Sequence, residues 1–449
     1  MSLKEKIVRI SPYFIQNIAV TFFNVYQYKI RHSGDYSKFR KYYKDIEKLP
    51  KDHLDKEIES KKKAFFGYVS KNSIWYKDYD FDNLSINRLL EKKEVINNLD
   101  LIKTINESEG LVSLTGGTTG ASMKVIYTKK DMQERFAILD HFRAQHGYEL
   151  GKKTAWFSGK NLITNEDLKK GRCSHYDFIN KIRFYSTFQI NEKNFDIYWN
   201  SINNFQPEFI VGFPSSVYEL CKIAQARGLR YKGKVQVFFP TAETVLNEHR
   251  EVINAVFGCK LVDQYASSEG APFILECLHG GLHIHPLTGI FEVLDDNLQP
   301  SQIGQLVITS FTTHGTPLVR YKIGDSIILA DDNKKCKCGS VFPLVESIQG
   351  RTNDYILSPD FGKVNLGNIS NSTKDTQGII CFQLIQNEIY NIDVNLVVND
   401  KYSKTQEINF ISALRERVGP NVKLNFNYLD EIPKEKSGKF RLVKNNIGN

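Results

Sequence analysis

The alternation of short strand-like runs with helical stretches, which begins near residue 108, constrains the fold of this chain most strongly. Runs rich in β-branched and aromatic residues occupy 124–128, 209–211 and 235–239, and helical stretches follow at 131–146, 214–227 and 245–256. A strand, a helix and a second strand usually form a parallel βαβ unit. The pattern therefore predicts an α/β fold with mixed, mostly parallel sheets covered by helices.

The pattern differs in the other parts of the chain. Residues 1–105 are mostly helical, with Lys-rich surfaces and few turn signals. Strand signals with tight turns between about 282 and 330, at 289–294 and 304–309, predict a smaller and more antiparallel sheet. After Gly350, a segment has its own strand signal at 390–398 and helix signal at 407–417.

These changes predict a large N-terminal domain followed by a small C-terminal domain. In the large domain, residues 1–105 form the helical N-terminal part, and residues 106–351 form the core with a β-rich subdomain. Residues 352–449 form a small, mobile α+β domain.

The distribution of charge excludes one class of partner. The chain carries 60 Lys and Arg against 51 Asp and Glu, and residues 1–63 hold 15 of the basic and eight of the acidic residues. Seven of the nine excess positive charges thus lie near the N-terminus. The remainder lacks the basic stripe of a nucleic-acid-binding surface, so we predict no nucleic-acid partner.

The longest uncharged run is Ile10–Tyr28, and its polar residues would be costly inside a bilayer. No cleavage site typical of a signal peptide follows it, which favours a cytoplasmic protein. We interpret the run as a helix that faces the protein core. The alternative is peripheral contact with a membrane through the basic N-terminus, which includes Lys4, Lys6 and Arg9.

A loop rich in glycine and hydroxyl residues, SLTGGTTGASMK, occupies residues 113–124 where the α/β region begins. Its N–H and O–H groups can surround a polyphosphate, and Lys124 adds positive charge. It is not a Walker A loop, because Ala121 stands five residues after Gly116, where that motif continues with Gly-Lys. The other interpretation is an ordinary surface turn.

Four further segments follow in order: DQYASSEG at 263–270, RYKIGD at 320–325, GRTND at 350–354 and PKEKSGKFR at 433–441. In the first, Glu269 lies on a turn where it can bind Mg²⁺ together with phosphate oxygens. In the second, Asp325 can accept hydrogen bonds from both hydroxyls of a ribose. Taken singly, the four are also explained as turns, a linker and a solvated charged run.

In this order, the five segments resemble the adenylate-forming superfamily of acyl-coenzyme A synthetases. Within it they are most similar to the phenylacetate-coenzyme A ligase type and to the CapK-like proteins linked to capsular polysaccharide clusters. The likeness extends from about residue 70 to the C-terminus, and it includes Pro214-Ser215 at a helix start and Thr241-Ala242-Glu243 after a strand.

The resemblance implies an enzyme that binds ATP and Mg²⁺ and releases AMP, with coenzyme A as a further cofactor. It implies that Lys439 and Glu269 are catalytic, Lys439 by stabilising the transferring phosphoryl group from a mobile domain and Glu269 by binding Mg²⁺. The implied phosphate-loop residues are Thr115, Gly116, Gly117, Thr118, Thr119, Gly120 and Lys124. The residues implied to contact adenine, ribose or the α-phosphate are Ala242, Glu243, Gln264, Tyr265, Ala266, Ser268, Asp325 and Arg351.

The seven cysteines are few for the length and do not favour a secreted disulfide framework. Cys336 and Cys338 form a close pair, and the segment 277–283 adds Cys277, His279 and His283. Zinc prefers four such ligands, and the CapK-like branch has a similar order of Cys and His. We predict a structural zinc site of Cys277, His283, Cys336 and Cys338, with His279 as the alternative imidazole. The competing interpretation is free thiols.

The leading hypothesis is an ATP-dependent, AMP-forming ligase that adenylates a small carboxylic acid and transfers the acyl group to a thiol, most directly coenzyme A. Alternatives are transfer to an amine in capsular or surface polysaccharide biosynthesis, and transfer of AMP to a hydroxyl. A hypothesis of another class is a non-catalytic nucleotide-binding protein.

The acid pocket is expected along residues 131–185. Its candidate polar contacts are His141, Arg143 and Lys160, which a solvated helix face explains equally well.

Overall fold

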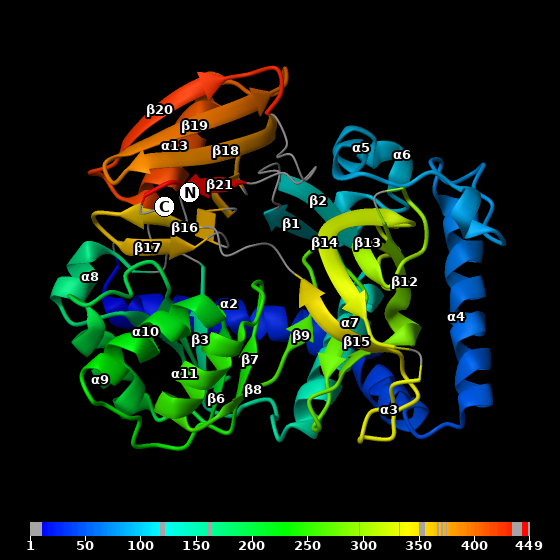
Figure 1. Ribbon diagram of the computed structural model, residues 1–449, viewed down its shortest axis with the longest axis horizontal. Coiled ribbons are helices and arrows are strands. Elements are labelled where there is room, and N and C mark those ends of the chain that lie inside the picture. The colour runs from blue at the N-terminus through cyan, green and yellow to red at the C-terminus, as the bar shows by residue number, and fades with distance from the viewer. Residues whose placement is uncertain are drawn as a thin grey trace.

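The computed structural model describes residues 11–116, 122–159, 163–295, 297–331, 333–349, 355–365, 368–369, 371–373, 375–432 and 442–447. The described residues form a six-stranded and a seven-stranded sheet. Figure 1 shows the first with its helices beside the second, and the C-terminal strands packed near the first. The predicted α/β class is confirmed.

The six-stranded sheet has the order β4-β5-β3-β6-β7-β8 and is parallel except for its edge strand β4, which runs antiparallel to β5. Its strands are β3 (Thr154–Ser158), β4 (Ser174–Asp177), β5 (Ile182–Ser186), β6 (Phe209–Gly212), β7 (Val237–Pro240) and β8 (Lys260–Leu261). The helices between them are α9 (Phe195–Phe205), α10 (Pro214–Ala226) and α11 (Asn247–Phe257).

Both faces of this sheet are buried, because alternate side chains of each strand enter different clusters. In β7, Phe238 packs with α9, α10 and α11, whereas Phe239 packs with Phe142 of α7 (Lys129–Gln145) on the opposite face. Burial on both faces explains the nearly continuous apolar runs of β6 and β7, the two strands of this sheet that were recognisable in the sequence.

The seven-stranded sheet is antiparallel throughout, with the order β12-β13-β14-β15-β11-β10-β9. Its strands are β9 (Gln264–Tyr265), β10 (Ile274–Glu276), β11 (Leu282–Ile284), β12 (Gly289–Leu294), β13 (Ile303–Ser310), β14 (Tyr321–Leu329) and β15 (Leu344–Gln349). The predicted antiparallel sheet with strands near 289–294 and 304–309 is confirmed, but the sheet is larger than predicted and begins at Gln264 instead of near residue 282. Strands β9 to β11 have only two or three residues, too few to show an alternating pattern.

A separate antiparallel hairpin carries the glycine-rich segment. Strands β1 (Leu111–Gly116) and β2 (Ser122–Tyr127) pair along their whole length, so the strand predicted at 124–128 does not join the parallel sheet. Residues 117–121, which connect the two strands, lie outside the described residues.

The C-terminal strands form a four-stranded sheet of order β20-β19-β18-β21 and a hairpin of β16 and β17. The elements are β16 (Tyr355–Ser358), β17 (Gly362–Asn365), β18 (Ile379–Glu388), β19 (Asn391–Val398), α13 (Lys404–Val418), β20 (Lys423–Tyr428) and β21 (Val443–Asn445). The short helix η4 (Asn371–Thr373) lies against β1. The predicted boundary near residue 352 falls outside the described residues.

The N-terminal helices are α2 (Tyr13–His32), α3 (Tyr36–Ile46), α4 (Lys51–Asn72), α5 (Lys92–Asn97) and α6 (Leu99–Ile102). Shorter helices are η1 (Leu84–Ile86), η2 (Glu107–Glu109), α8 (Asn165–Lys169) and η3 (Pro286–Thr288). Within the described residues, none of the helices has the length and apolar character needed to cross a membrane.

Helix α2 is oriented against the prediction of a core-facing apolar helix. Its buried residues are polar, and Phe14 and Phe22 are exposed. Asn17 Oδ1 accepts a hydrogen bond from Tyr176 N (3.1 Å), and Thr21 Oγ1 accepts one from Phe178 N (3.1 Å). The physical reason is the sheet edge: the outer backbone groups of β4 need partners, and the polar side chains of α2 supply them.

On most helices the truncation of an apolar side chain destabilises the fold more than the truncation of a polar one, and on α2 we expect the opposite. Replacing Asn17→Ala leaves a buried backbone N–H without its acceptor, so we expect a loss of about 2 kcal/mol in the free energy of unfolding. The control Phe22→Ala removes an exposed side chain and is expected to change it by less than about 0.5 kcal/mol. Denaturant unfolding of both variants measures the difference, and equal effects would contradict the described packing of α2.

Candidate functional site

Two turns meet beyond the ends of β7 and β9. In open α/β sheets ligands bind beyond the carboxyl ends of the parallel strands, and β7 is one of these strands. The buried Gln264 joins them: its Nε2 donates to Pro240 O (3.1 Å), and its Oε1 accepts from Arg143 Nε of α7 (3.0 Å). The side chain of Gln264 thus fixes the two turns relative to each other.

The turn after β7 has a backbone conformation that is uncommon for its sequence. Ala242 has φ +64°, in the left-handed region that costs a residue with Cβ about 1 kcal/mol. The next residue, Glu243, accepts a hydrogen bond at Oε2 from Ser215 N at the start of α10 (3.1 Å). Its Oε1 is buried and has no hydrogen-bond partner among the described residues, and burial raises the pKa of this carboxyl to about 7.

The turn after β9 carries Glu269 and is held in place by Arg135 of α7. The Arg135 guanidinium donates to Gly270 O (3.0 Å), Ala271 O (3.1 Å) and Thr312 Oγ1 (2.8 Å), and it lies 4.7 Å from the centroid of the Phe273 ring. On the other side of Glu269, Tyr127 OH donates to the carbonyl oxygen of Ser268 (2.9 Å).

These contacts leave the Glu269 carboxylate buried but unengaged, with no hydrogen bond or ion pair to the described residues. Glycine is required next to it, since Gly270 has φ +85° and a Cβ there would lie 2.4 Å from Thr313 Cγ2. The turn is therefore rigid, and its carboxylate is suited to bind a cation.

A hydrogen bond brings two other predicted residues together. Tyr265 OH of β9 donates to Asp325 Oδ2 of β14 (2.9 Å), although the two lie 60 residues apart in the chain. The tyrosine ring and the carboxylate thus share one region beside the Glu269 turn, as a nucleoside site would require.

Several buried hydroxyl groups lie near the glycine-rich hairpin. Thr115 Oγ1 on β1 is buried without a hydrogen-bond partner among the described residues. The same holds for the hydroxyls of Ser372 and Thr373 in η4, which lies against β1. Buried polar atoms without partners are uncommon, so these hydroxyl groups are candidates to donate hydrogen bonds to a ligand. Lys124 instead pairs with Glu107 of η2 (2.6 Å).

The remaining predicted residues fall into three groups. Ala266 and Ser268 are exposed on the Glu269 turn. His141 pairs with Glu47 (3.0 Å), and Arg143 is engaged by Gln264 as described above, so both polar candidates for the acid pocket have protein partners. The residues outside the described part of the chain are Gly117, Thr118, Thr119, Gly120, Lys160, Arg351 and Lys439.

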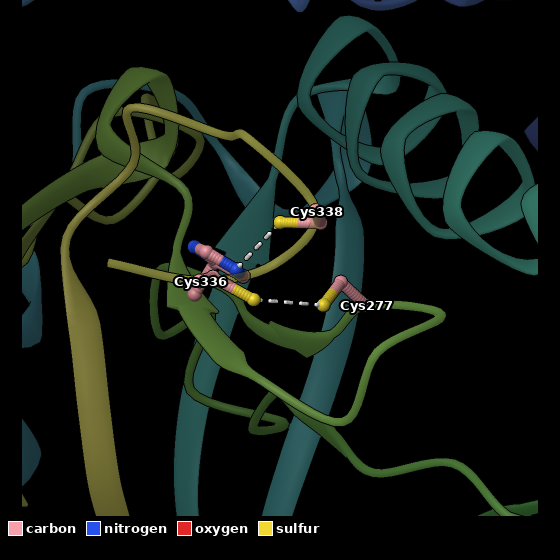
Figure 2. Close-up of side chains that lie close together, drawn as sticks. Cys277, Cys336 and Cys338 are labelled. Carbon is pink, nitrogen blue, oxygen red and sulfur yellow. Dashed lines mark hydrogen bonds between the residues drawn. The ribbon is translucent and has the colours of Figure 1, made fainter. Parts of the chain in front are cut away.

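Four predicted metal ligands come together at the end of the β10–β11 hairpin. The ligand atoms of Cys277, His283, Cys336 and Cys338 all lie within 4.8 Å of one another. The sulfur atoms of Cys277 and Cys336 face each other at 3.5 Å (Figure 2), and Cys338 Sγ lies 3.3 Å from His283 Nε2. A tetrahedral zinc ion with Zn–S bonds near 2.3 Å holds its ligand atoms about 3.8 Å apart, which these separations approach.

The surroundings of the four residues also fit a metal ion. His283 Nδ1 lies 3.1 Å from Phe342 O, to which it donates in the tautomer that leaves Nε2 free to bind a metal. A Cβ at Gly281 would lie 2.7 Å from Cys336 Sγ, so glycine is needed to admit the sulfur. The 3.5 Å separation of Cys277 and Cys336 is far longer than a disulfide bond.

Comparison with known proteins assigns the chain to a family. It is 32% identical to Protein CapK of Staphylococcus aureus over 458 residues, covering 97% of this chain and 98% of that protein. The chain belongs to the CapK family. The family of the CapK C-terminal domain matches residues 356–446.

Two other relatives connect the CapK family to a broader group. Phenylacetate-coenzyme A ligase of Thermus thermophilus is 26% identical over 260 residues, which cover 56% of each chain. A solved 2-hydroxyisobutyryl-CoA ligase, in complex with 2-HIB-AMP and CoA, shares the fold with a TM-score of 0.59 and 15% identity, covering 89% of this chain and 92% of that one. The predicted membership in the adenylate-forming superfamily of AMP-forming acid ligases is confirmed.

Two residues that support the Glu269 turn, Arg135 and Tyr127, were missed in the sequence. Arg135 stands among other charged residues of a helix, and its acceptors are mainly backbone carbonyls, which have no sequence signature. Tyr127 at the end of β2 resembles an ordinary strand residue. Its position shortly after the glycine-rich segment 113–124 was the one available clue.

The raised pKa of Glu243 predicts a dependence of stability on pH. The folded protein holds this proton more tightly than the unfolded chain, so stability falls by up to about 3 kcal/mol as pH rises from the usual value of 4.5 to about 7. Glu243→Gln mimics the protonated group, so we expect a variant more stable than wild type above pH 7 and equal to it near pH 4. The control Glu251→Gln, at an exposed site on α11, should follow the wild-type profile in denaturant unfolding.

Proposed function

We propose that this protein is an ATP-dependent, AMP-forming ligase that adenylates a small carboxylic acid and transfers the acyl group to the thiol of coenzyme A. The observation that carries the proposal is the buried Glu269, which Arg135 and Tyr127 hold in a rigid turn with no counter-ion among the described residues. The Tyr265–Asp325 pair beside it and the membership in the CapK family support the same activity.

In the proposed reaction, a carboxylate oxygen of the acid attacks the α-phosphorus of ATP, and the bond to the β-phosphate oxygen breaks to release pyrophosphate. Glu269 would hold Mg²⁺, which neutralises charge on the phosphates when bound. Thr115 to Gly120 would bind the β- and γ-phosphates, while Ser268 would contact the α-phosphate. Lys439 would stabilise the charge that grows on the transferring phosphoryl group.

The nucleoside would lie between the two turns. Asp325 would accept hydrogen bonds from the ribose, with Arg351 contacting ribose or phosphate, while Ala242, Glu243, Gln264, Tyr265 and Ala266 would border adenine. In the second half-reaction, the thiol of coenzyme A attacks the acyl carbon and AMP leaves. Because ATP and coenzyme A are supplied in the cytoplasm, the proposed reaction belongs there.

An amine acceptor is the second candidate. The match to Protein CapK extends over nearly the whole chain, whereas the match to phenylacetate-coenzyme A ligase covers about half of it. The chain resembles the CapK-like proteins linked to capsular polysaccharide clusters, and transfer of the acyl group to an amino sugar would form an amide. Mass spectrometry of products with coenzyme A or with amino sugars separates the two acceptors.

Exchange of labelled pyrophosphate into ATP tests the adenylation step with a panel of carboxylic acids. We expect one class of acid to support exchange in the wild type, and Lys439→Ala to lower it at least about 100-fold because the growing charge loses its cation. The control Lys436→Ala, from the same segment, should retain activity. Full exchange by the Lys439→Ala variant, or none by the wild type with any acid, would refute the mechanism.

We also propose that Cys277, His283, Cys336 and Cys338 bind a structural zinc ion. It would join the β10–β11 hairpin to the loop between β14 and β15, and it would contribute binding energy to folding. The role is structural because all four ligands come from the protein and leave no open coordination position.

Metal analysis of the purified protein tests the zinc site. The wild type should contain stoichiometric zinc, while Cys336→Ser should lose most of it and melt at least about 5 °C lower. The control Cys381→Ser alters a cysteine of β18 outside the cluster and should keep the metal. If the wild-type protein contains no metal and added zinc does not change its melting temperature, the zinc site is refuted and the four residues are free side chains.

A further inference from the structure

We propose that the outer face of α2, together with the turn between β4 and β5, docks onto the surface of an anionic lipid bilayer. This docking face consists of Phe14, Ile15, Phe22, Phe23, Tyr26, Phe178 and Ile179. It is separate from the nucleotide site, so it goes beyond the proposed ligase activity.

The side chains of the docking face are unusually exposed for their size. The exposed fractions are 65% for Phe14, 69% for Phe22 and 62% for Tyr26, and they are 46% for Phe178 and 62% for Ile179. Phe14, Phe22 and Tyr26 are spaced by multiples of four and thus share one side of the helix. Single exposed apolar residues are ordinary on protein surfaces, but a cluster of this size indicates an interaction site.

Two contacts make the helix and the turn one continuous surface. The Phe14 and Phe178 rings lie 6.2 Å apart between centroids, and Phe178 N donates to Thr21 Oγ1 of α2 (3.1 Å). In Figure 1, α2 extends beside the six-stranded sheet toward α7, and it contacts both β4 and α7.

The inner face of α2 explains why its apolar residues point outward. Gln16, Asn17 and Thr21 are buried; Asn17 accepts a hydrogen bond from the backbone of β4 and Thr21 accepts one from the backbone of the turn that follows it. Rotating the helix to bury its phenylalanines would leave these backbone groups without partners. The apolar face therefore stays outside in the folded protein, where only a second apolar surface can cover it.

The charges around the docking face favour an anionic surface. Residues 6–34 contain no Asp or Glu, and the exposed Lys29 and Lys181 flank the helix end and the turn. Arg172 lies 4.7 Å from the ring of Tyr13. The acidic residue next to the turn, Asp177, is buried and accepts hydrogen bonds from the backbone N–H groups of Ile179 and Asn180.

This charge distribution also argues against a second copy of the chain as the partner. A symmetric dimer through the docking face would bring its positively charged rim against itself, which is unfavourable. Anionic headgroups would instead pair with these cations while the apolar side chains enter the boundary of the acyl chains.

Vesicle sedimentation of the full chain tests the proposal. We expect binding to phosphatidylcholine vesicles that contain phosphatidylserine, and binding weaker by at least about tenfold without the anionic lipid. The double variant Phe22→Asp with Phe178→Asp should bind the anionic vesicles at least about tenfold more weakly than the wild type. The matched control is Ile408→Asp, which alters a residue of α13 that is 59% exposed, and it should bind normally.

A second measurement locates the contact. A Phe22→Trp variant adds the fluorescence of one tryptophan to that of the wild type. Brominated lipids should quench this added fluorescence, as expected for a side chain that enters the acyl region. Pyrophosphate exchange in the absence of vesicles should be unchanged in the double variant, so the test is independent of the ligase activity.

Three results would overturn the proposal. These are the absence of wild-type binding to anionic vesicles, equal binding by the double variant, and lack of quenching in the Phe22→Trp variant. Analytical ultracentrifugation that shows a dimer abolished by the double variant would assign the docking face to a second copy instead.

Discussion

The buried charges of α7 are the constraint on which the rest of the structure depends. This helix carries five charged side chains that are almost fully buried, namely Asp131, Glu134, Arg135, Asp140 and Arg143. Asp131 accepts from His314 Nδ1 (2.6 Å), Asp140 from Tyr36 OH (3.0 Å) and Glu134 from Tyr43 OH (2.6 Å). Removing one partner of such a buried charge costs about 3–5 kcal/mol, so the helix has essentially one compatible position.

The position of α7 determines both the candidate site and the docking face. Through Arg135 it holds the Glu269 turn, and through Arg143 it holds Gln264 between the two turns. Through Asp140, which lies 2.9 Å from His32 Nε2, it also fixes the C-terminal end of α2. A ligand site that needs rigid groups is thus built on a helix whose polar contacts leave little freedom.

The sequence was informative where side-chain patterns are local, and it failed where partners are distant. Two of the buried parallel strands, β6 and β7, and the helices α10 and α11 were predicted, because continuous apolar runs and helical spacing occur within a few residues. The clustering of Cys277, His283, Cys336 and Cys338 also followed from their residue types. The orientation of α2 did not follow, since an apolar run is equally compatible with a core and with an outer surface. The role of Arg135 was hidden because backbone carbonyls bind it.

The cysteine cluster and Arg135 act on the two ends of the segment 270–277, which follows Glu269 and contains β10. The Glu269 turn lies between β9 and β10, which have two and three residues and are too short to be stable by their own hydrogen bonds. Arg135 holds the start of the segment at Gly270, while Cys277 follows β10 directly and belongs to the metal-ligand cluster. Between them, Glu276 pairs with Arg250 of α11 (2.8 Å) and accepts from Asp263 N (2.7 Å). A metal ion at the cluster would therefore restrain the carboxylate of Glu269 from a distance, without taking part in the chemistry.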